Sequence, residues 1–260
     1  MLADLRGFVF DLDGCVWAGA ALMPGAAETL AALRRRGRRL GFISNNSRAR
    51  GAELRARLER LGVATDGSPV LTPLEILGRV IAERFGPSRV LVIGAPEMAA
   101  SIAAAGHEVV DVADAPRARV VAVGNDFDFS YGRLTAASRA AAAGAPLVTP
   151  NVDPRLPIEG GDFLPGCGAI VAAVAVAAGV EPLVVGKPHG HLFRIALDGL
   201  GLSAAATAMV GDSVESDVAG GRATGMRTVL YAPGGAPAGT ADVIVRSFAD
   251  LARLAGVDGR

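Results

Sequence analysis

The feature that most constrains this chain of 260 residues is a regular alternation between short Val- and Ile-rich runs and longer Ala-, Leu- and Arg-rich segments. The runs FVF, LGFIS and VLVIG are each followed by a segment with helical spacing, at residues 26–36, 50–61 and 97–105. Apolar runs of this kind indicate strands buried on both faces, and helical crossovers between them indicate a parallel sheet. The alternation therefore predicts an α/β fold with a doubly wound, Rossmann-like parallel sheet.

The middle of the chain, residues 85–179, carries an alternation of its own. Strands are expected at VVAVG and PLVTP, and the segment ends in the Gly- and Pro-rich stretch NVDPRLPIEGGDFLPG. We interpret it as an α/β domain inserted into a core domain formed by residues 1–84 and 180–260. The alternative is one large sheet, because β/α folds of this length also occur as single domains. Strands at AMVGD, TVLY and DVIV and a helix at 247–256 complete the predicted core.

Composition excludes several classes of protein. The 26 basic and 26 acidic residues give a formal net charge of zero, so we expect no nucleic-acid partner. Cys15 and Cys167 are too sparse for a disulfide framework and fit a reducing compartment, as small apolar fillers. No signal peptide or membrane span is expected, and the Ala-rich run at 169–178 is interpreted as a buried helix. A cytoplasmic protein is the expectation.

Compact polar side chains follow three of the expected strands. They are Asp11 and Asp13 after FVF, Ser44 to Asn46 after LGFI, and Asp212 after AMVG. Open parallel sheets bind ligands at the carboxyl ends of their strands, near a switch in strand order. A shared site at that edge is a simpler account than three unrelated turns.

Asp11 and Asp13 lie two residues apart in FVFDLDG. In an extended strand, alternate side chains share a face, so both carboxylates can approach one small site. Gly14 lets the chain turn away behind them. One carboxylate can attack a phosphoryl group while the other donates or accepts a proton. This is the arrangement that phosphoryl transfer needs. A polar strand end followed by a turn is the alternative for so short a motif.

Ser44, Asn45 and Asn46 offer a hydroxyl and two amides at a strand end, where backbone N–H groups also point outward. Such donors suit the oxygens of a transferring phosphoryl group. Ser and Asn are also preferred helix N-caps, which is the alternative role for this segment.

Lys187, in VVGKPH, is the only lysine of the chain. Arginine is used wherever a surface charge suffices, so a lone lysine after an apolar run predicts a fixed point charge that neutralises phosphate and carboxylates. A nucleotide-binding P-loop is disfavoured, because the upstream glycine spacing and the Ser or Thr after the lysine are missing. His189 and His191 are assigned no chemistry.

Asp212 and Asp217, in GDSVESD, can supply hard oxygen ligands at a strand end and in the turn that follows. Mg²⁺ prefers six oxygens, keeps several waters and needs only one or two protein carboxylates besides the substrate phosphate. The pair therefore predicts a magnesium site. A calcium-binding EF-hand is excluded, because the stretch lacks the turn glycine and the final bidentate glutamate.

The segments FVFDLDG, FISNNS, VGKPH and MVGDSVESD resemble the four ordered motifs of the haloacid dehalogenase-like hydrolase superfamily. The resemblance covers almost the whole chain. The length of the insert, with DLDGCVW and ISNNS, is similar to the NagD-type branch, which includes para-nitrophenyl phosphatases, phosphoglycolate phosphatases and pyridoxal phosphate phosphatases. The resemblance implies that the inserted domain is a cap that closes over the site of the core.

The resemblance also implies a role for each motif. Asp11 is the expected nucleophile that forms an aspartyl-phosphate, and Asp13 is the general acid and base that a dehalogenase does not need. Mg²⁺ would be held by Asp11, the backbone carbonyl of Asp13 and Asp212. Asp217 would orient Lys187 or a water on the ion, or bind the ion itself. The expected catalytic residues are Asp11, Asp13, Ser44 and Lys187.

Substrate contacts are expected from both domains. The candidates in the core are Gly14, Ser44, Asn45, Asn46 and Lys187. The cap stretch TPNVDPRLP resembles a cap loop of the family, ATNPD, although Val152 replaces the usual proline. Its candidates are Asn151, Asp153 and Arg155, with a plain loop as the alternative. Arg155 would suit a carboxylated substrate such as phosphoglycolate.

The motifs together predict a magnesium-dependent phosphatase that hydrolyses a small phosphorylated metabolite. Phosphoglycolate, pyridoxal phosphate, sugar phosphates and nucleotide monophosphates are the classes considered. The alternatives are a phosphotransferase or mutase with the same intermediate, and a non-catalytic regulator that binds a phosphometabolite, which would not need Asp13 and Lys187 together. Caps of this type often pair between subunits in the family, so a homodimer through the cap is a further expectation.

Overall fold

The computed structural model describes residues 2–157 and 162–258. The chain divides into two compact units: Met1–Ser44, Gly51–Leu71 and Lys187–Arg260 form the first, and Asn45–Arg50 and Thr72–Gly186 form the second. The second unit extends past the expected insert boundaries at residues 85 and 179 and takes in residues 45–50 as well. The interpretation of these units as separate core and cap domains stays a prediction.

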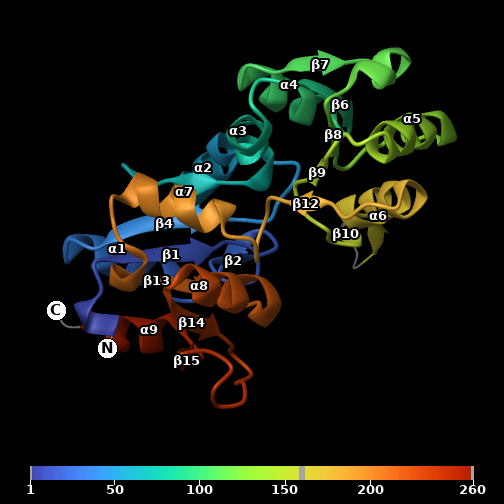
Figure 1. Cartoon of the computed structure of the whole chain (residues 1–260). Coiled ribbons are helices and arrows are strands. Elements are labelled where there is room, and N and C mark those ends of the chain that lie inside the picture. The colour runs from blue at the N-terminus through green and yellow to red at the C-terminus, as the bar shows by residue number, and fades with distance from the viewer. Residues whose placement is uncertain (1, 158–161, 259–260) are drawn as a thin grey trace. The chain divides into compact units, whose positions relative to one another are not determined.

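The first unit is built on a parallel sheet of six strands (Figure 1). They are β1 (Gly7–Asp11), β4 (Arg39–Ile43), β5 (Val70–Leu71), β13 (Thr207–Gly211), β14 (Arg227–Tyr231) and β15 (Val243–Val245). The strand order is β15-β14-β13-β1-β4-β5, with every neighbouring pair parallel. The chain moves outward from β1 to β5 and returns to β13 on the other side of β1, so the switch in strand order lies beside β1. The predicted α/β class is confirmed.

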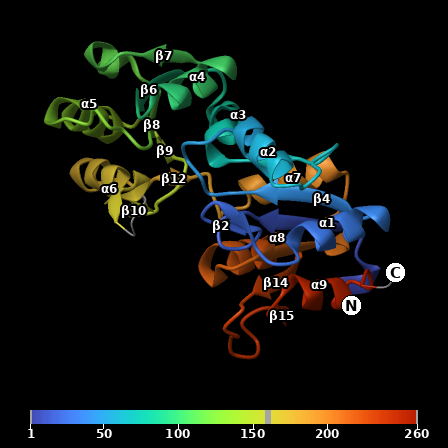
Figure 2. The ribbon, with the colours of Figure 1, turned by 180° about the vertical axis from the view of Figure 1, so that it is seen from behind.

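Helices cover both faces of this sheet. They are α1 (Ala26–Arg35), α2 (Gly51–Arg60), α7 (His191–Leu200), α8 (Ala219–Thr224) and α9 (Phe248–Leu254). α7 packs against α8 on the face turned toward the viewer in Figure 1, and α1 packs against α9 on the face seen in Figure 2. All five residues of β1 are consequently buried, as expected for a central strand covered on both sides.

Aromatic rings fill the interior around the central strand of the first unit. Phe10 stacks with Phe42 of β4 at 6.1 Å between ring centroids and with Phe248 of α9 at 6.4 Å. All three side chains are completely buried. Offset stacking of large rings adds to the gain from burying their apolar area. The cluster therefore holds firmly the end of β1 that carries Asp11.

The second unit has a parallel sheet of its own. Its strands are β6 (Arg89–Ile93), β7 (Glu108–Val110), β8 (Val120–Val123), β9 (Leu147–Thr149) and β12 (Leu183–Val184), in the order β12-β9-β8-β6-β7. The helices are α3 (Pro73–Phe85), α4 (Pro96–Ala104), α5 (Tyr131–Ala142) and α6 (Cys167–Ala178). Within this unit α3 and α4 lie on one face of the sheet and α5 and α6 on the other (Figure 1).

Two details of the second unit differ from the sequence prediction. The expected buried helix at 169–178 has one buried face only, because Val176 of α6 is 83% exposed. The stretch 151–166 is not only loop, since β10 (Arg155–Pro157) and β11 (Phe163–Pro165) pair antiparallel within it. Residues 158–161 of that stretch lie outside the described residues. The alternation and the composition of the sequence do not show these two features. The burial of α6 and the pairing of β10 with β11 depend on which segments pack beside them.

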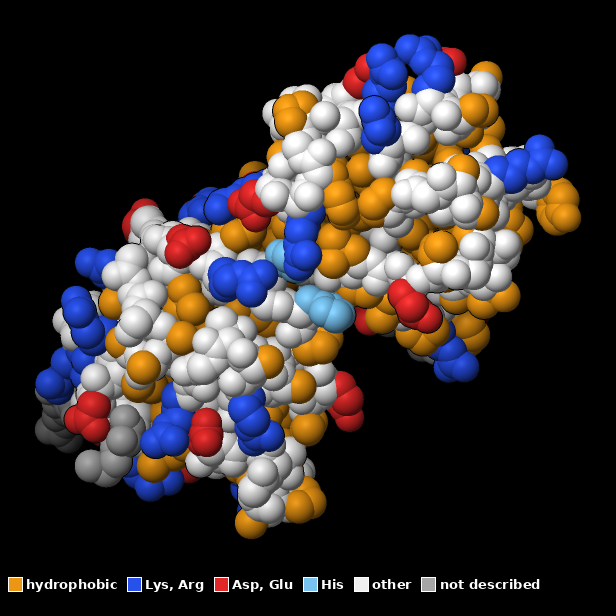
Figure 3. Space-filling view, in the orientation of Figure 1, with side chains coloured by type: hydrophobic (Ala, Val, Ile, Leu, Met, Phe, Trp, Pro, Cys, Tyr) orange, Lys and Arg blue, Asp and Glu red, His pale blue; other side chains and the backbone are white. Residues whose placement is uncertain are grey.

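The charged side chains at the surface are mixed in sign, and both cysteines are buried. Basic and acidic side chains are interspersed on the face shown in Figure 3, without a broad field of one sign. Cys15 and Cys167 are both buried and free. Across residues 2–157 and 162–258, no helix combines the length and the apolar character needed to cross a membrane.

Candidate active site

Three buried charged side chains meet at the carboxyl end of the first sheet. Asp11 ends β1, Asp217 lies in a π-helical turn (Val214–Val218) that follows β13, and Lys187 begins the last segment of the first unit. Lys187 Nζ donates to Asp11 Oδ1 and, at 2.6 Å, to Asp217 Oδ1. Asp11, Lys187 and Asp217 are 4%, 5% and 1% exposed. One lysine thus joins two sequence motifs that the chain keeps far apart.

The electrostatics of this group are set by burial and by the excess of carboxylates. Burial raises the pKa of Asp11 to about 8, against the pull of Lys187 and with a further push from Asp217. For Lys187, burial acts to lower the pKa, but Asp11 and Asp217 outweigh it and hold the pKa above its ordinary value. The lysine therefore stays charged. When both carboxylates are ionised, they exceed the one ammonium by a negative charge that a further cation can neutralise.

The carboxylates also fit a hard metal ion. One oxygen from each of Asp11, Asp212 and Asp217 lies within 4.8 Å of the others. Burial, followed by the charge of Asp217, raises the pKa of Asp212. Asp217 has both oxygens engaged, by Lys187 and by the backbone N–H of Ser213 at 3.1 Å. Asp11 and Asp212 are therefore better placed than Asp217 to hold a divalent metal ion.

Gly14 makes room for this arrangement. Its φ of 87° lies in the left-handed region that favours glycine. A Cβ at this position would also overlap the carboxylate of Asp212. Gly14 is therefore required both for the turn after Asp13 and for the approach of Asp212 to that turn.

The side chain of Asp13 has different hydrogen-bond partners from those of Asp11. Its Oδ2 accepts a hydrogen bond from Ser44 Oγ at 3.2 Å, and its Oδ1 accepts one from Trp17 Nε1 at 2.8 Å. Ser44 follows β4, the strand next to β1, so its position at the same sheet edge follows from the strand order. The structure thus brings Asp11, Asp13, Ser44, Lys187, Asp212 and Asp217 to one edge of the first sheet.

The other predicted site residues belong to the second unit. Asn46 Oδ1 accepts from the backbone N–H groups of Arg48 and Ala49, both at 2.9 Å, as a turn-forming residue does. Asn151 Nδ2 donates to the carbonyl of Asn45 at 2.8 Å, and its Oδ1 accepts from the backbone N–H of Asp153 at 3.2 Å. The Arg155 guanidinium lies 4.3 Å from the ring centroid of Phe163. Each of these side chains has a structural partner, and their contact with substrate stays a prediction.

Sequence reasoning passed over two residues of the site. Trp17 contacts Asp13 directly, and the Arg57 guanidinium lies 4.1 Å from the centroid of the Trp17 ring. The available signal was that Trp17 is the only tryptophan of the chain and stands four residues after Asp13.

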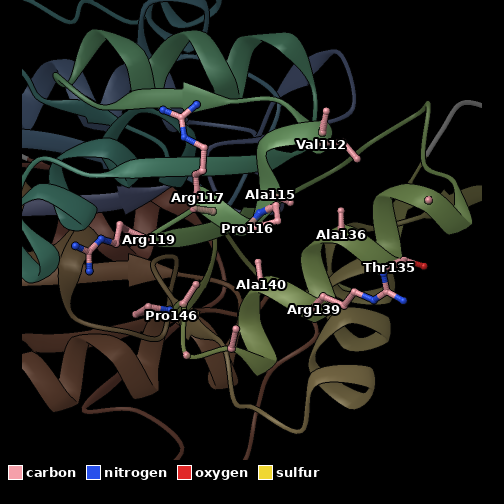
Figure 4. A pocket seen from close by; sticks show the side chains of 16 residues that line it. Val112, Ala115, Pro116, Arg117, Arg119, Thr135, Ala136, Arg139, Ala140 and Pro146 are labelled. Atoms are coloured by element: carbon pink, nitrogen blue, oxygen red, sulfur yellow. The ribbon is translucent and has the colours of Figure 1, made fainter.

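A hollow of about 1130 Å³ lies in the second unit between α5 and the 3₁₀ segment η2 (Val112–Arg117). None of the predicted site residues lines it. In Figure 4 the side chains of Arg117, Arg119 and Arg139 extend away from its small apolar residues in different directions. It contains no carboxylate and no paired nucleophile and base, so its size alone does not make it a candidate active site.

Comparison with known proteins agrees with this geometry. The family model described as haloacid dehalogenase-like hydrolase matches residues 8–108, and the one described as HAD-hydrolase-like matches residues 184–251. The chain is 36% identical to a glycerol-3-phosphate phosphatase of Homo sapiens, in an alignment covering 90% of this chain and 81% of that protein.

Solved structures show the same likeness. The p-nitrophenyl phosphatase from Archaeoglobus fulgidus is 30% identical, with a TM-score of 0.84 over 96% of this chain and 99% of that one. NagD from the E. coli K-12 strain is 25% identical, with a TM-score of 0.83 over 95% of this chain and 98% of that one. These similarities are the ones that the four motifs predict.

Proposed function

This chain belongs to the haloacid dehalogenase-like hydrolases and is a phosphatase of that family, and from this premise we propose that it hydrolyses phosphomonoesters of small metabolites through a phosphorylated Asp11. The observation that carries the proposal is the buried group in which Lys187 bridges Asp11 and Asp217 beside Asp212. A carboxylate is a weak nucleophile, and a phosphate dianion repels it. A fixed ammonium between the two reduces that repulsion.

The first proposed step is transfer of the phosphoryl group to the enzyme. A carboxylate oxygen of Asp11 forms a bond to phosphorus as the ester P–O bond breaks. The protonated carboxyl of Asp13 gives its proton to the leaving oxygen, which departs as an alcohol. Ser44 and Lys187 stabilise the charge on the phosphoryl oxygens during transfer.

The second step returns the enzyme to its starting state. Asp13, now a carboxylate, accepts a proton from the water that attacks phosphorus, and the bond between phosphorus and Asp11 breaks. Inorganic phosphate leaves, and both carboxyl groups regain their first forms. Asp13 thus acts as acid in one step and as base in the next, a role typically worth about 10²–10⁴ in rate.

The proposed cofactor is Mg²⁺, held by Asp11, Asp212 and the backbone carbonyl of Asp13. When bound, the ion supplies positive charge for the phosphate oxygens. The position of Asp217 between Lys187 Nζ and the Ser213 N–H supports a role in orienting the lysine. It leaves Asp217 a less suitable ligand than Asp212 for the ion.

The proposed substrate class is that of small phosphorylated metabolites. A similar protein is named for glycerol-3-phosphate and a similar structure for p-nitrophenyl phosphate, which supports alkyl and aryl phosphomonoesters alike. We further propose that the second unit acts as a cap, with Asn45, Asn46, Asn151, Asp153 and Arg155 near the substrate and Gly14 beside the phosphate. A cytoplasmic location and a homodimer through the cap complete the proposal.

Phosphate release from a panel of phosphomonoesters tests this function. The panel contains glycerol 3-phosphate, phosphoglycolate, pyridoxal phosphate, sugar and nucleotide monophosphates and 4-nitrophenyl phosphate, each with Mg²⁺ and with a chelator. We expect magnesium-dependent turnover, and none from the Asp11→Asn variant purified in the same way, which controls for contaminating phosphatases. No phosphate release by the folded wild-type protein across the panel contradicts the proposal. Consumption of a phosphomonoester only in the presence of a sugar, with formation of a sugar phosphate in place of inorganic phosphate, indicates a phosphotransferase.

A further inference from the structure

Trp17 is placed against Asp13 by the chain's own local folding. The segment from Leu12 to Trp17 closes on itself, because the N–H groups of Val16 and Trp17 donate to the Leu12 carbonyl at 2.9 and 3.0 Å. The N–H of Gly14 in turn donates to the Trp17 carbonyl at 2.8 Å. This tight loop returns the indole to Asp13, where Nε1 donates to Oδ1 at 2.8 Å.

The indole is fixed in this position by its surroundings. Trp17 is completely buried, and it belongs to the short hairpin of β2 (Trp17–Ala18) and β3 (Ala21–Leu22), in which it pairs with Leu22. The Arg57 guanidinium lies over the ring and also donates to the Gly19 carbonyl at the tip of the hairpin. A cation on the face of an indole is attracted to its π electrons. Trp17 therefore has one orientation, which points its N–H at Asp13.

A fixed N–H distinguishes the two oxygens of Asp13. The indole nitrogen can only donate, so Oδ1 cannot carry a proton that points at it. Oδ2 faces Ser44 Oγ, a hydroxyl that can donate or accept as needed. We propose that Trp17 is a positioning residue that holds the Asp13 carboxyl so that Oδ2 is the oxygen that exchanges the proton with the leaving group and with water. The inference rests on the proposed role of Asp13 as general acid and base.

The proposal makes a prediction about leaving groups. As the Asp11–phosphorus bond forms and the ester P–O bond breaks, an alkyl leaving oxygen must receive the proton from Asp13 Oδ2 to depart as an alcohol. A 4-nitrophenyl leaving group departs as a stable anion and gains little from that proton. Loss of the indole N–H should therefore slow the cleavage of alkyl phosphates more than the cleavage of 4-nitrophenyl phosphate.

The test compares the wild-type enzyme with Trp17→Phe, which keeps an aromatic ring and removes the N–H. The measurement is kcat/KM, which reports the steps up to phosphoryl transfer, for 4-nitrophenyl phosphate and for the alkyl phosphate of the panel that the wild-type enzyme cleaves best. We expect the alkyl value to fall about 10- to 100-fold, the worth of a hydrogen bond to a charged group, and the aryl value by less than about threefold. The ratio of the two values is unaffected if part of the variant is unfolded.

Two further variants separate positioning from general damage. Thr29→Val removes another buried hydrogen bond of the first unit, from Thr29 Oγ1 to the Phe248 carbonyl at 3.1 Å, and should leave the ratio unchanged. In an Asp13→Asn background, Trp17→Phe should have no additional effect on the ratio, because the group it positions no longer carries the proton.

The outcomes distinguish this inference from the function on which it rests. If Asp13→Asn lowers alkyl cleavage selectively but Trp17→Phe lowers both substrates equally, the positioning role is wrong and the proposed function stands. If Asp13→Asn itself shows no selectivity, the proposed role of Asp13 is wrong, and the inference about Trp17 is overturned with it. An effect of Trp17→Phe that persists undiminished in the Asp13→Asn background also contradicts the inference.

Discussion

Both units of this molecule are built on parallel sheets, but the sheets differ in strand order and in the charges that follow their strands. In the first unit, Asp11, Asp212 and Asp217 lie near a single cation, Lys187. In the second unit β8 leads to Asp126, whose carboxylate has its own partner in Arg133, with Oδ2 and Nε 2.9 Å apart. The strand order reverses beside β1 in the first sheet and beside β6, next to the edge strand β7, in the second.

The difference shows that the fold alone does not determine the chemistry. In the second unit, the charge of the Asp126 carboxylate is balanced by the Arg133 guanidinium. Three carboxylates around one lysine leave a negative charge that is stable only if a metal ion or protons compensate it. The excess of carboxylates is therefore the reason that we propose the first unit as the catalytic one.

The largest expected effect comes from replacing the carboxylate that the account makes the nucleophile. Asp11→Asn should reduce turnover of every phosphomonoester by at least about 10⁴-fold, because no phosphoenzyme can form. Circular dichroism and the unfolding midpoint should show a folded protein, since the substitution removes a buried charge. Substantial residual turnover would remove Asp11 from the mechanism.

Replacing the shared cation should damage both stability and activity. Lys187→Met keeps the length of the side chain but leaves Asp11 and Asp217 buried without their partner, at a cost of about 3–5 kcal/mol in the free energy of unfolding. Phosphatase activity should fall as well, because the proposed mechanism uses the charge of Lys187. Arg79→Met is the matched control, because it breaks an exposed ion pair with Glu83 and should cost less than about 1 kcal/mol. The free energy of unfolding is measured with urea, and equal losses of it in the two variants contradict the account.

Stability should depend on pH and on Mg²⁺ together. Burial raises the pKa of Asp11 from 3.8 to about 8, so between these values the folded protein binds a proton that the unfolded chain has released. In the absence of metal, this group lowers the free energy of unfolding as pH rises through that window. Mg²⁺ stabilises the carboxylate form, so the Tm gain that it gives should be larger near pH ~8 than near pH ~5. A gain that does not change with pH contradicts this assignment.

The smallest effect on activity should come from Asp126, the carboxylate that follows β8 of the second unit. Asp126→Asn removes the charge that pairs with Arg133 and should lower the free energy of unfolding by about 1–3 kcal/mol. Turnover of 4-nitrophenyl phosphate should stay within about twofold of wild type, because Asp126 belongs to no part of the proposed chemistry. A loss of turnover comparable to that of Asp11→Asn would erase the distinction between the two units.

The sequence predicts much of the first unit because local patterns carry the information. Asp11, Ser44 and Asp212 each follow an apolar run, and parallel strands place such residues at one edge of the sheet. The uniqueness of Lys187 points to the site in the same way. A contact between Lys187 and Asp217 is one of the roles that the resemblance of the motifs implies for Asp217, and in the structure Lys187 Nζ lies 2.6 Å from Asp217 Oδ1.

Other features depend on contacts that no local pattern encodes. Trp17 reaches Asp13 through a closed loop, and Arg57 reaches the indole from a helix in another part of the sequence. β12 is only two residues long, and its pairing with β9 of the second unit is decided by tertiary contacts. The exposed side of α6 is another such feature. The helix is rich in Ala and Val on both its buried and its exposed face, so its sequence does not reveal which face is covered.

The central claim is that phosphate passes through Asp11, and acid-quenched mass spectrometry during turnover of 4-nitrophenyl phosphate tests it most directly. The account predicts a phosphorylated peptide with the added mass on Asp11, present in the wild-type enzyme and absent from Asp11→Asn. The adduct should accumulate further in Asp13→Asn, where attack by water lacks its base. Turnover with no adduct on Asp11, or with the adduct on another residue, would contradict the account.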